Sequence, residues 1–572
     1  MNIGSDGHNA LLPLRGLPAR LTATLGTTLA WAAALITLVT SAIVSWIGFC
    51  DTPYGDHWII VPDLGRLDNL LVAHGDHPIF FGRIVFWLDW VLFEGRERFL
   101  QIVSIALIAA QVPAFVWLAR KTGVTRPLLT VTPFAITVIL ASREHQNFVE
   151  AFQASFVPAF TFAAWSFGAF AAYLERNSRL MLTVSIATAA LATVSLANGA
   201  FAPLVLAGVA VAFGRRKIAV LFAVVALAGL ALSVPAALAG GNANTLSIPS
   251  ALRFFFVYLG APASGWSVDV AIIAGVVTAA AATGAIAYVI WRRRDQPAFV
   301  ALAGILIFAF LTALVTTAGR SFAGDLFGVI GVAGGSRYHI VLALMYVATG
   351  IVAIDALKHL VGPVRRILLH LSPVAGGILV ACALAGIPVI GTFSATHRND
   401  LKGITAMVAD VNDQAITDLA GFWVVLGRAD MVAPAVVRLR TEQRSVFADA
   451  VARRVGGTFT AVELASPDCA SSSRWEAMPP EGNDGHRSAS GMFSRTQLSS
   501  GASHILISDR SGSVVGYGRV PRRPSDLNPF AQADGRDVDW QGDIRPGASP
   551  PLTAWLFTAD TMRCALGTSA ES

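Results

Sequence analysis

The chain has 572 residues, of which 54% are hydrophobic and only 14% charged, and its mean hydropathy is +0.61. Soluble domains carry about 25% charged residues, so this composition excludes a soluble globular protein. Residues 1–390 hold 24 Lys and Arg against 16 Asp and Glu, whereas residues 391–572 hold 18 against 20. Because the basic excess belongs to the apolar part, it indicates membrane topology, and we expect no nucleic-acid partner.

Apolar runs recur along residues 1–390, each long enough to cross a ~30 Å hydrocarbon layer as a helix. They lack the period-two alternation of a transmembrane β-barrel, so we predict a polytopic α-helical membrane domain. Eleven spans are expected, at residues 24–48, 99–119, 127–141, 152–173, 179–196, 199–213, 218–238, 268–291, 298–317, 338–356 and 367–390.

The first outer loop, residues 49–98, opens with Asp51-Thr-Pro-Tyr-Gly-Asp56 directly after the first span. Asp56, or alternatively Asp51, is a candidate general base, since a carboxylate at the membrane surface can accept a proton from a hydroxyl group. The plainer alternative is an ordinary loop with Asx turns.

Two more features follow in the same loop. His74, Asp76 and His77 are weak candidates for a divalent metal site, and a solvated loop is the favoured alternative. Residues 78–93 are apolar but contain Arg83, which predicts a helix lying at the membrane interface with its guanidinium available to a lipid phosphate.

Polar residues also gather at other outer segments. Glu144, Asn147 and Gln153 precede or open the fourth span, which is typical of a helix that faces a polar cavity; helix capping with snorkelling is the alternative. Arg320 and Arg337 flank a later outer loop and suit bidentate phosphate binding, with lipid headgroup contact as the alternative. Tyr258, in the outer segment 239–267, and Tyr338 are further cavity candidates.

The chain changes character after residue 390. Residues 391–455 favour a helical segment, and residues 456–572 favour a β-rich domain that we interpret as a β-sandwich. Residues 504–520 predict a hairpin that turns between Asp509 and Gly512. Outside the cytoplasm we expect a disulfide between Cys469 and Cys564, which flank the β-rich region.

These features together resemble the GT-C superfamily of membrane glycosyltransferases, through the acidic motif after the first span, the interfacial helix, the many spans and the outer tail. Further matching motifs are Glu150-Ala-Phe152-Gln153, Tyr258-Leu-Gly260, Gly319-Arg320 and Ser336-Arg337-Tyr338, which look like those of a bacterial GT-C-like group. The resemblance covers roughly residues 24–360. It implies a polyprenyl-phosphate sugar donor and an acidic base in the first outer loop. Many family members carry adjacent acidic residues there, whereas His57 follows Asp56 here, so the choice of base and the need for a metal stay open.

The predicted function is therefore transfer of a sugar from a polyprenyl-phosphate donor to an acceptor glycan or lipid outside a bacterial plasma membrane. One alternative is a transporter or flippase of lipid-linked glycan, which would place polar groups at mid-membrane. The other is a non-catalytic envelope-assembly protein that binds through its tail.

The topology is the first testable expectation. With a cytoplasmic N-terminus, sixteen of the 24 Lys and Arg before residue 390 fall in cytoplasmic segments and eight in outer ones. The domain of residues 391–572 is then periplasmic, and alkaline phosphatase fused to the C-terminus should be active. An inactive phosphatase fusion beside an active cytoplasmic reporter at the same site would overturn this layout.

Overall fold

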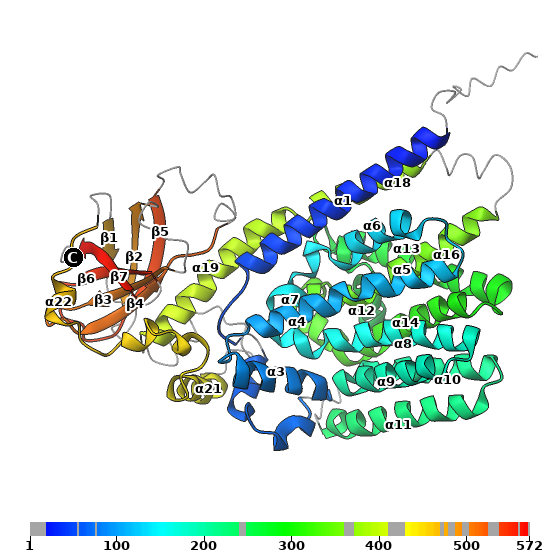
Figure 1. The fold of residues 1–572 in the computed structure, drawn as a ribbon, viewed down its shortest axis with the longest axis horizontal. Helices are drawn as coiled ribbons and strands as arrows, with labels where there is room; N and C mark the ends of the chain where they lie inside the picture. The colour runs from blue at the N-terminus through cyan, green and yellow to red at the C-terminus, as the bar shows by residue number, and fades with distance from the viewer. Residues whose placement is uncertain are drawn as a thin grey trace, which may run out of the picture.

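The computed structural model describes residues 19–53, 56–74, 77–239, 247–359, 371–409, 429–469, 474–478, 487–494, 503–523, 537–558 and 561–569. A bundle of apolar helices makes up most of the molecule, and a small β-sheet domain lies at one end of it (Figure 1). The predicted site residue Asp76 lies outside the described residues.

Eight of the described helical segments are long and apolar enough to cross a membrane. They lie in α1 (Ala19–Ile47), α4 (Arg98–Ala109) with α5 (Gln111–Lys121), α8 (Val157–Arg176), α11 (Arg216–Ala239), α13 (Val268–Tyr288), α14 (Pro297–Phe327), α16 (His339–Lys358) and α18 (Ser372–Leu384). This arrangement indicates a multi-pass membrane protein.

The other three predicted spans are helical but shorter, namely α6 (Pro127–Ile139), α9 (Arg179–Ser195) and α10 (Phe201–Ala212). An α-helix rises about 1.5 Å per residue, so each is shorter than a ~30 Å hydrocarbon layer. Length and composition therefore support eight of the eleven predicted spans.

One helix was missed by the sequence analysis. The expected outer loop at residues 239–267 contains α12 (Ile248–Leu259), a mostly apolar helix whose twelve residues are too few for a span but pack against α13 and α14. A Cβ on Gly275 of α13 would overlap the backbone carbonyl of Phe256. The close approach of the two helices therefore requires glycine at position 275, and it buries Tyr258 inside the bundle.

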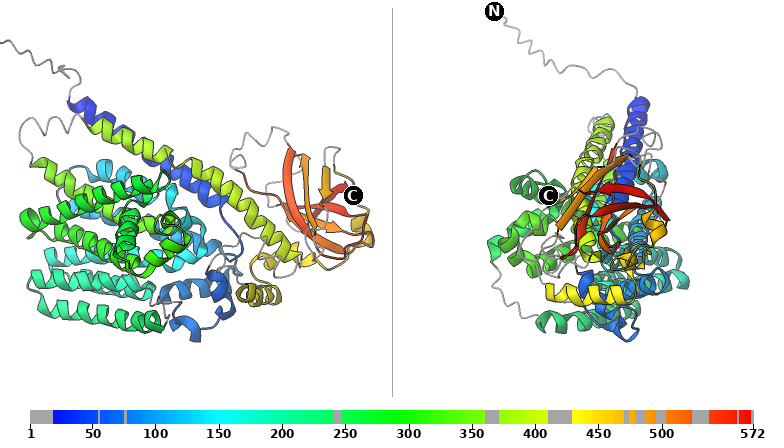
Figure 2. Two further views of the ribbon diagram at one scale, coloured as in Figure 1. Left: turned by 180° about the vertical axis from the view of Figure 1, so that it is seen from behind. Right: turned by 90° about the vertical axis from the view of Figure 1, so that its left-hand side faces the viewer.

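The first and last long apolar helices, α1 and α18, lie side by side along one edge of the bundle (Figures 1 and 2). Glycines allow this contact, because a Cβ on Gly26 would lie 2.8 Å from the carbonyl oxygen of Ser372, and one on Gly376 would lie 2.8 Å from the Cβ of Leu29. The Ser372 hydroxyl also donates to the carbonyl of Thr22 over 3.1 Å. Small residues at such crossings let two membrane helices pack backbone to backbone.

The first outer loop folds into α2 (His57–Ile60) and α3 (Phe80–Leu92). The second of these is the helix expected at residues 78–93, and one of its faces is buried against the protein. Gly82 on that face lies so close to the backbone of Ser155 that a larger side chain would clash.

The tail begins with α19 (Pro388–Val408) and α21 (Ala429–Thr441), in line with the expected helical segment. The strands that follow are β1 (Arg474–Ala477), β2 (Arg487–Ser494), β3 (Ser503–Ser508), β4 (Val514–Arg519), β5 (Asp537–Ile544), β6 (Thr553–Thr558) and β7 (Thr561–Thr568).

The described strands form one antiparallel sheet in the order β1-β2-β5-β4-β3-β6-β7, not the two stacked sheets of the predicted β-sandwich. The sheet curls into a half-barrel, and its edge strands are linked where Trp475 Nε1 donates to the carbonyl of Gly567 over 2.8 Å (Figure 2). Alternating apolar residues in a strand indicate that one face of its sheet is buried. They do not show whether a second sheet or the curl of the same sheet buries that face, so the sequence could not distinguish the two folds.

Two local predictions for the tail agree with the structure. Strands β3 and β4 form the expected hairpin, in which Gly512 has a φ of +80° and its N–H donates to the carbonyl of Asp509 over 3.0 Å. Cys469 and Cys564 form the expected disulfide. Of the remaining cysteines, Cys50 is buried and Cys382 is exposed.

The tail docks on the first outer loop through buried polar contacts. Both Asp51 carboxylate oxygens accept from the Arg519 guanidinium of β4, each over 2.8 Å. The Ser445 hydroxyl donates to the Asp51 carbonyl over 2.6 Å, and Arg522 donates to the carbonyl of Phe49 over 2.9 Å. Burial by itself raises the pKa of Asp51, but the charge and hydrogen bonds of Arg519 outweigh it and hold the pKa well below the ordinary carboxyl value.

We predict that Arg519→Met detaches or loosens the tail, because it leaves the Asp51 carboxylate mostly buried without its partner, at a cost of up to about 3 kcal/mol. The wild-type pair stabilises the protein at neutral pH, and this contribution is lost only as the pH falls to strong acid. Limited proteolysis of the tail measures the effect. The double variant Asp51→Asn/Arg519→Met should resist protease better than Arg519→Met alone, and equal sensitivity of the two would contradict the ion-pair explanation.

Candidate functional site

A cavity of about 270 Å³ lies between the loop of residues 49–98 and the helical bundle. The first outer loop, the start of α8, the α9–α10 junction, α12, α14 and the segment before α16 all contribute to its wall. Its hydrogen-bonding and charged lining residues are Asp56, His77, Gln153, Asn198, Ser233, Tyr258, Thr312, Thr316, Arg320, Arg337 and Tyr338.

Asp56 enters the cavity from the residue before α2, and two histidines surround it. The backbones of His74 and His77 pair by mutual N–H to carbonyl hydrogen bonds of 2.9 and 3.0 Å. His74 Nε2 lies 3.8 Å from Asp56 Oδ2. The contact with His74 lowers the pKa of Asp56, and the charges of Arg337 and Arg320 lower it further against the opposing effect of burial. The carboxylate is therefore ionised at neutral pH.

Arg337 is held in place through its backbone, by a residue that lies 191 positions earlier in the chain. The side-chain oxygen of Gln146 accepts from the Arg337 N–H and from the Ser336 hydroxyl, each over 3.0 Å. Asn147 Nδ2 donates to the Arg337 carbonyl over 3.3 Å. The guanidinium remains available to the cavity and lies 5.2 Å from the centre of the Tyr338 ring.

Gln153 and Glu150 connect the two charged sides of the site. Gln153 lies in the short 3₁₀ helix η4 (Ala151–Ser155), and its Nε2 donates to Glu150 Oε2 over 3.0 Å. Burial raises the pKa of Glu150, although Gln153 and the charge of Arg337 oppose this shift. Glu150 is thus an acidic group within electrostatic range of both Asp56 and Arg337.

The rest of the wall is apolar and faces the interior of the bundle. It is made by Phe156, Phe160, Leu196, Phe201, Leu230 and Val315, from the start of α8, the α9–α10 region, α11 and α14. The cavity therefore joins a charged outer end to a hydrocarbon surface that continues toward the membrane helices.

Seven of the predicted site residues meet in this cavity: Asp56, Gln153, Tyr258, Arg320, Arg337, Tyr338 and the weak metal candidate His77. Asp51 does not line it, because both of its carboxylate oxygens are engaged by Arg519. Arg83 does not line this cavity; it is buried and its Nε donates to the carbonyl of Val72 over 2.7 Å, and its contact with a lipid phosphate stays a prediction. Asn147 supports the wall from behind, and Glu144 lines a different cavity.

The weak metal prediction finds no support in the part of the chain that the structure describes, which contains no group of three or more His, Cys, Asp or Glu residues able to hold a metal ion. His77 does line the cavity and His74 contacts Asp56, so these histidines belong to the site as neighbours of the carboxylate.

Sequence reasoning missed a buried network beneath Asp56. His57 Nδ1 lies 3.0 Å from Glu97 Oε2, and the Glu97 N–H donates to Asp89 Oδ2 over 3.3 Å. All three side chains are buried. The network holds His57, the residue next to Asp56, in place. Its three residues lie too far apart in the sequence for their spacing to predict that they are in contact.

Comparisons of the chain with protein-family models, with curated proteins and with solved structures found no match.

The buried network generates a pH prediction. Burial, together with the charge of Glu97, raises the pKa of Asp89 to about 7. Because the folded state holds this proton more tightly than the unfolded state, the stability it supports is lost as the pH rises through about 7. Asp89→Asn cannot ionise, so between about pH 5.5 and 8.5 its apparent Tm in detergent should fall less than that of the wild type. Parallel Tm curves for the two proteins would show that Asp89 does not titrate in this range.

Proposed function

We propose that the protein is a membrane glycosyltransferase that moves a sugar from a polyprenyl-phosphate donor to an acceptor hydroxyl outside a bacterial plasma membrane. The observation that carries the proposal is the meeting of Asp56, Arg320 and Arg337 in one cavity beside an apolar wall. The resemblance to GT-C enzymes points the same way, because it implies this donor and a base in this loop.

The two arginines suit the phosphate of the donor. A guanidinium group donates two parallel hydrogen bonds to phosphate oxygens and stays charged at any physiological pH. As the bond between the sugar and the phosphate breaks, negative charge grows on the leaving phosphate, and fixed positive groups stabilise that charge. Arg337 is well suited to this role because hydrogen bonds to Gln146 fix its backbone.

Asp56 suits the role of general base. In the proposed step the acceptor oxygen forms a bond to the anomeric carbon, the bond from that carbon to the phosphate oxygen breaks, and the acceptor proton passes to Asp56. Polyprenyl phosphate leaves with the electron pair. The carboxylate is ionised at neutral pH, so it is ready to take the proton.

The apolar wall suits the prenyl chain of the donor. Phe156, Phe160 and Phe201 present hydrocarbon surface directly below the charged end of the cavity. A lipid phosphate has the same order of parts, a charged head followed by a hydrocarbon chain. A nucleotide sugar has no hydrocarbon chain that could pack against this wall.

We predict that Asp56→Asn lowers transfer by ~10²–10⁴ while leaving protein levels normal, because asparagine keeps the size of the side chain but cannot accept the proton. The measurement is mass spectrometry of lipid-linked sugars and surface glycans in a deletion strain that carries each variant. Asp68→Asn is the matched control, since Asp68 lies exposed in the same loop and forms an ion pair with exposed Arg66. Full complementation by Asp56→Asn would move the chemistry out of this cavity.

Arg337→Lys tests the phosphate contact separately. An ammonium group cannot reproduce the two-pronged contact, so this variant should accumulate the polyprenyl-phosphate sugar even though the positive charge is kept. Accumulation of a complete lipid-linked glycan in the deletion strain would favour a flippase and count against the transferase.

A further inference from the structure

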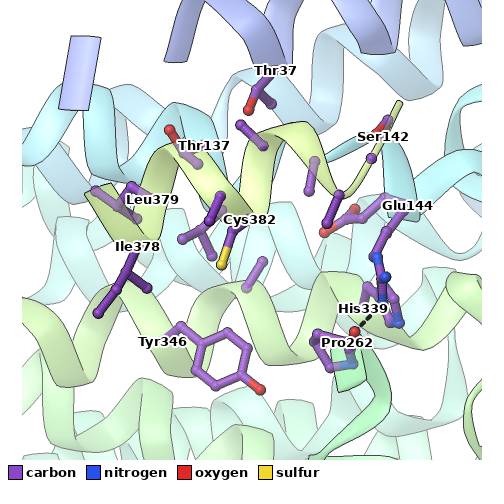
Figure 3. Close-up of a pocket in the computed structure, with 18 of the residues that line it drawn as sticks. Thr37, Thr137, Ser142, Glu144, Pro262, His339, Tyr346, Ile378, Leu379 and Cys382 are labelled. Atoms are coloured by element: carbon purple, nitrogen blue, oxygen red, sulfur yellow. Dashed lines mark hydrogen bonds between the residues drawn. The ribbon is translucent and has the colours of Figure 1, made fainter. Parts of the chain in front are cut away.

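A second and larger cavity, of about 420 Å³, lies on the other side of the bundle. It is bounded by α1, α6, α16 and α18 and by the short segment η3 (Ser142–Glu144) (Figure 3). Small-molecule sites in proteins have volumes of about 300–1,000 Å³, so the cavity is large enough for a ligand.

The lining of this second cavity is apolar at one end and polar at the other. Thr137, Ile378, Leu379 and Cys382 lie along α6 and α18, whereas Ser142, Glu144 and His339 lie together at the end next to η3 (Figure 3). The polar end coincides with the outer ends of the helices in the predicted topology. A lipid whose head lies at the outer membrane surface and whose chain lies in the bilayer has a polar end and an apolar end in the same order.

Two buried groups at the polar end point to a ligand. Glu144 is 1% exposed, and among the described residues neither of its carboxylate oxygens has a partner in ordinary hydrogen-bond geometry, although Asn147 lies nearby. Figure 3 shows this carboxylate turned toward the interior of the cavity. His339 Nε2 is likewise buried without a hydrogen-bond partner in the described part of the chain. Buried polar groups are normally paired, so a bound molecule would supply what the protein does not.

The two cavities share a wall. In the segment that begins at η8 (Ser336–Tyr338), Arg337 and Tyr338 line the first cavity and the next residue, His339, lines the second. Tyr346 of the second cavity donates to the carbonyl of Leu259, the neighbour of Tyr258 in the first, over 3.2 Å. Two amphipathic cavities thus stand back to back at the outer face.

We propose that the second cavity binds a second lipid, whose hydrocarbon chain lies along α18 and whose head is uncharged and rich in hydroxyl groups. Hydroxyl groups can both donate to the His339 nitrogen and hydrogen-bond with the Glu144 carboxyl group. An anionic head fits poorly, because Arg143, a cation in the lining, already donates to the carbonyl of Pro262.

Burial raises the pKa of Glu144 well above the ordinary carboxyl value, which favours the neutral carboxyl group that can donate to such a head. Given the proposed function, the lipid in this cavity is the acceptor, held on the far side of the segment that carries Arg337 and Tyr338. The binding itself does not depend on transfer and can be measured without it.

Cys382 provides a built-in reporter, because it lines the cavity and is exposed, whereas Cys50 is buried and the other two cysteines form the disulfide. Purified full-length protein in nanodiscs of phosphatidylglycerol is alkylated with N-ethylmaleimide, with and without dioleoylglycerol. Dioleoylglycerol should slow the alkylation of Cys382 several-fold, and dioleoyl phosphatidic acid, with the same chains and a charged head, should not. Equal protection by both lipids would overturn the assignment of the head, and no protection by either would overturn the site.

Two pairs of variants test the same inference by native mass spectrometry of bound dioleoylglycerol. Ala381→Phe fills the cavity and should abolish binding, whereas Leu384→Phe, at an exposed position of the same helix outside the lining, should not. Glu144→Ala should weaken binding about three- to tenfold through the lost hydrogen bond, and Glu144→Gln should retain it. Retained binding in Ala381→Phe, or an equal loss in both Glu144 variants, would contradict the proposal. If the wild-type protein bound dioleoylglycerol but transferred no sugar, the result would count against the proposed function and leave the lipid site standing.

Discussion

The walls of both cavities depend on one set of hydrogen bonds between segments 190 residues apart. Gln146 accepts from the backbone of Arg337 and from the hydroxyl of Ser336, and its own N–H donates back to that hydroxyl. These bonds convert a loop between two membrane helices into a fixed wall. The same wall presents an arginine to one cavity and a histidine to the other, so both sites depend on it.

The tail likewise fixes the loop that carries Asp56, which forms another part of the wall of the first cavity. The loop that carries Asp56 shares one hydrophobic core with the tail, built from Trp58, Phe86, Trp90, Leu439, Phe447 and Tyr517. Arg438 of α21 adds hydrogen bonds of 2.7 and 2.6 Å to the carbonyls of Val61 and Leu64. A loop at a membrane surface is ordinarily among the less stable parts of a protein. Here the tail packs on it, so the position of the candidate base follows from the docking of a domain more than 300 residues away in the sequence.

The burial of polar groups separates structural residues from candidate functional ones. Asp51 and Arg519 form a closed pair, and the Arg83 guanidinium is held by a backbone carbonyl. Asp56, Arg320 and Arg337 instead face an open space. A charged group in a folded protein is costly unless it is paired or hydrated. Those that remain open to a cavity are therefore the better candidates for ligand contact.

The sequence by itself determined the membrane class, most helix positions, the β3–β4 hairpin and the disulfide, because each follows from local hydropathy, turn chemistry or the pairing of few cysteines. It also singled out most of the polar residues that line the first cavity. It did not separate Asp56 from Asp51, find α12, or foresee the curled sheet and the second cavity. Only the tertiary structure decided these points, because they depend on which distant segment packs against each residue: an arginine of the tail engages one aspartate and leaves the other open.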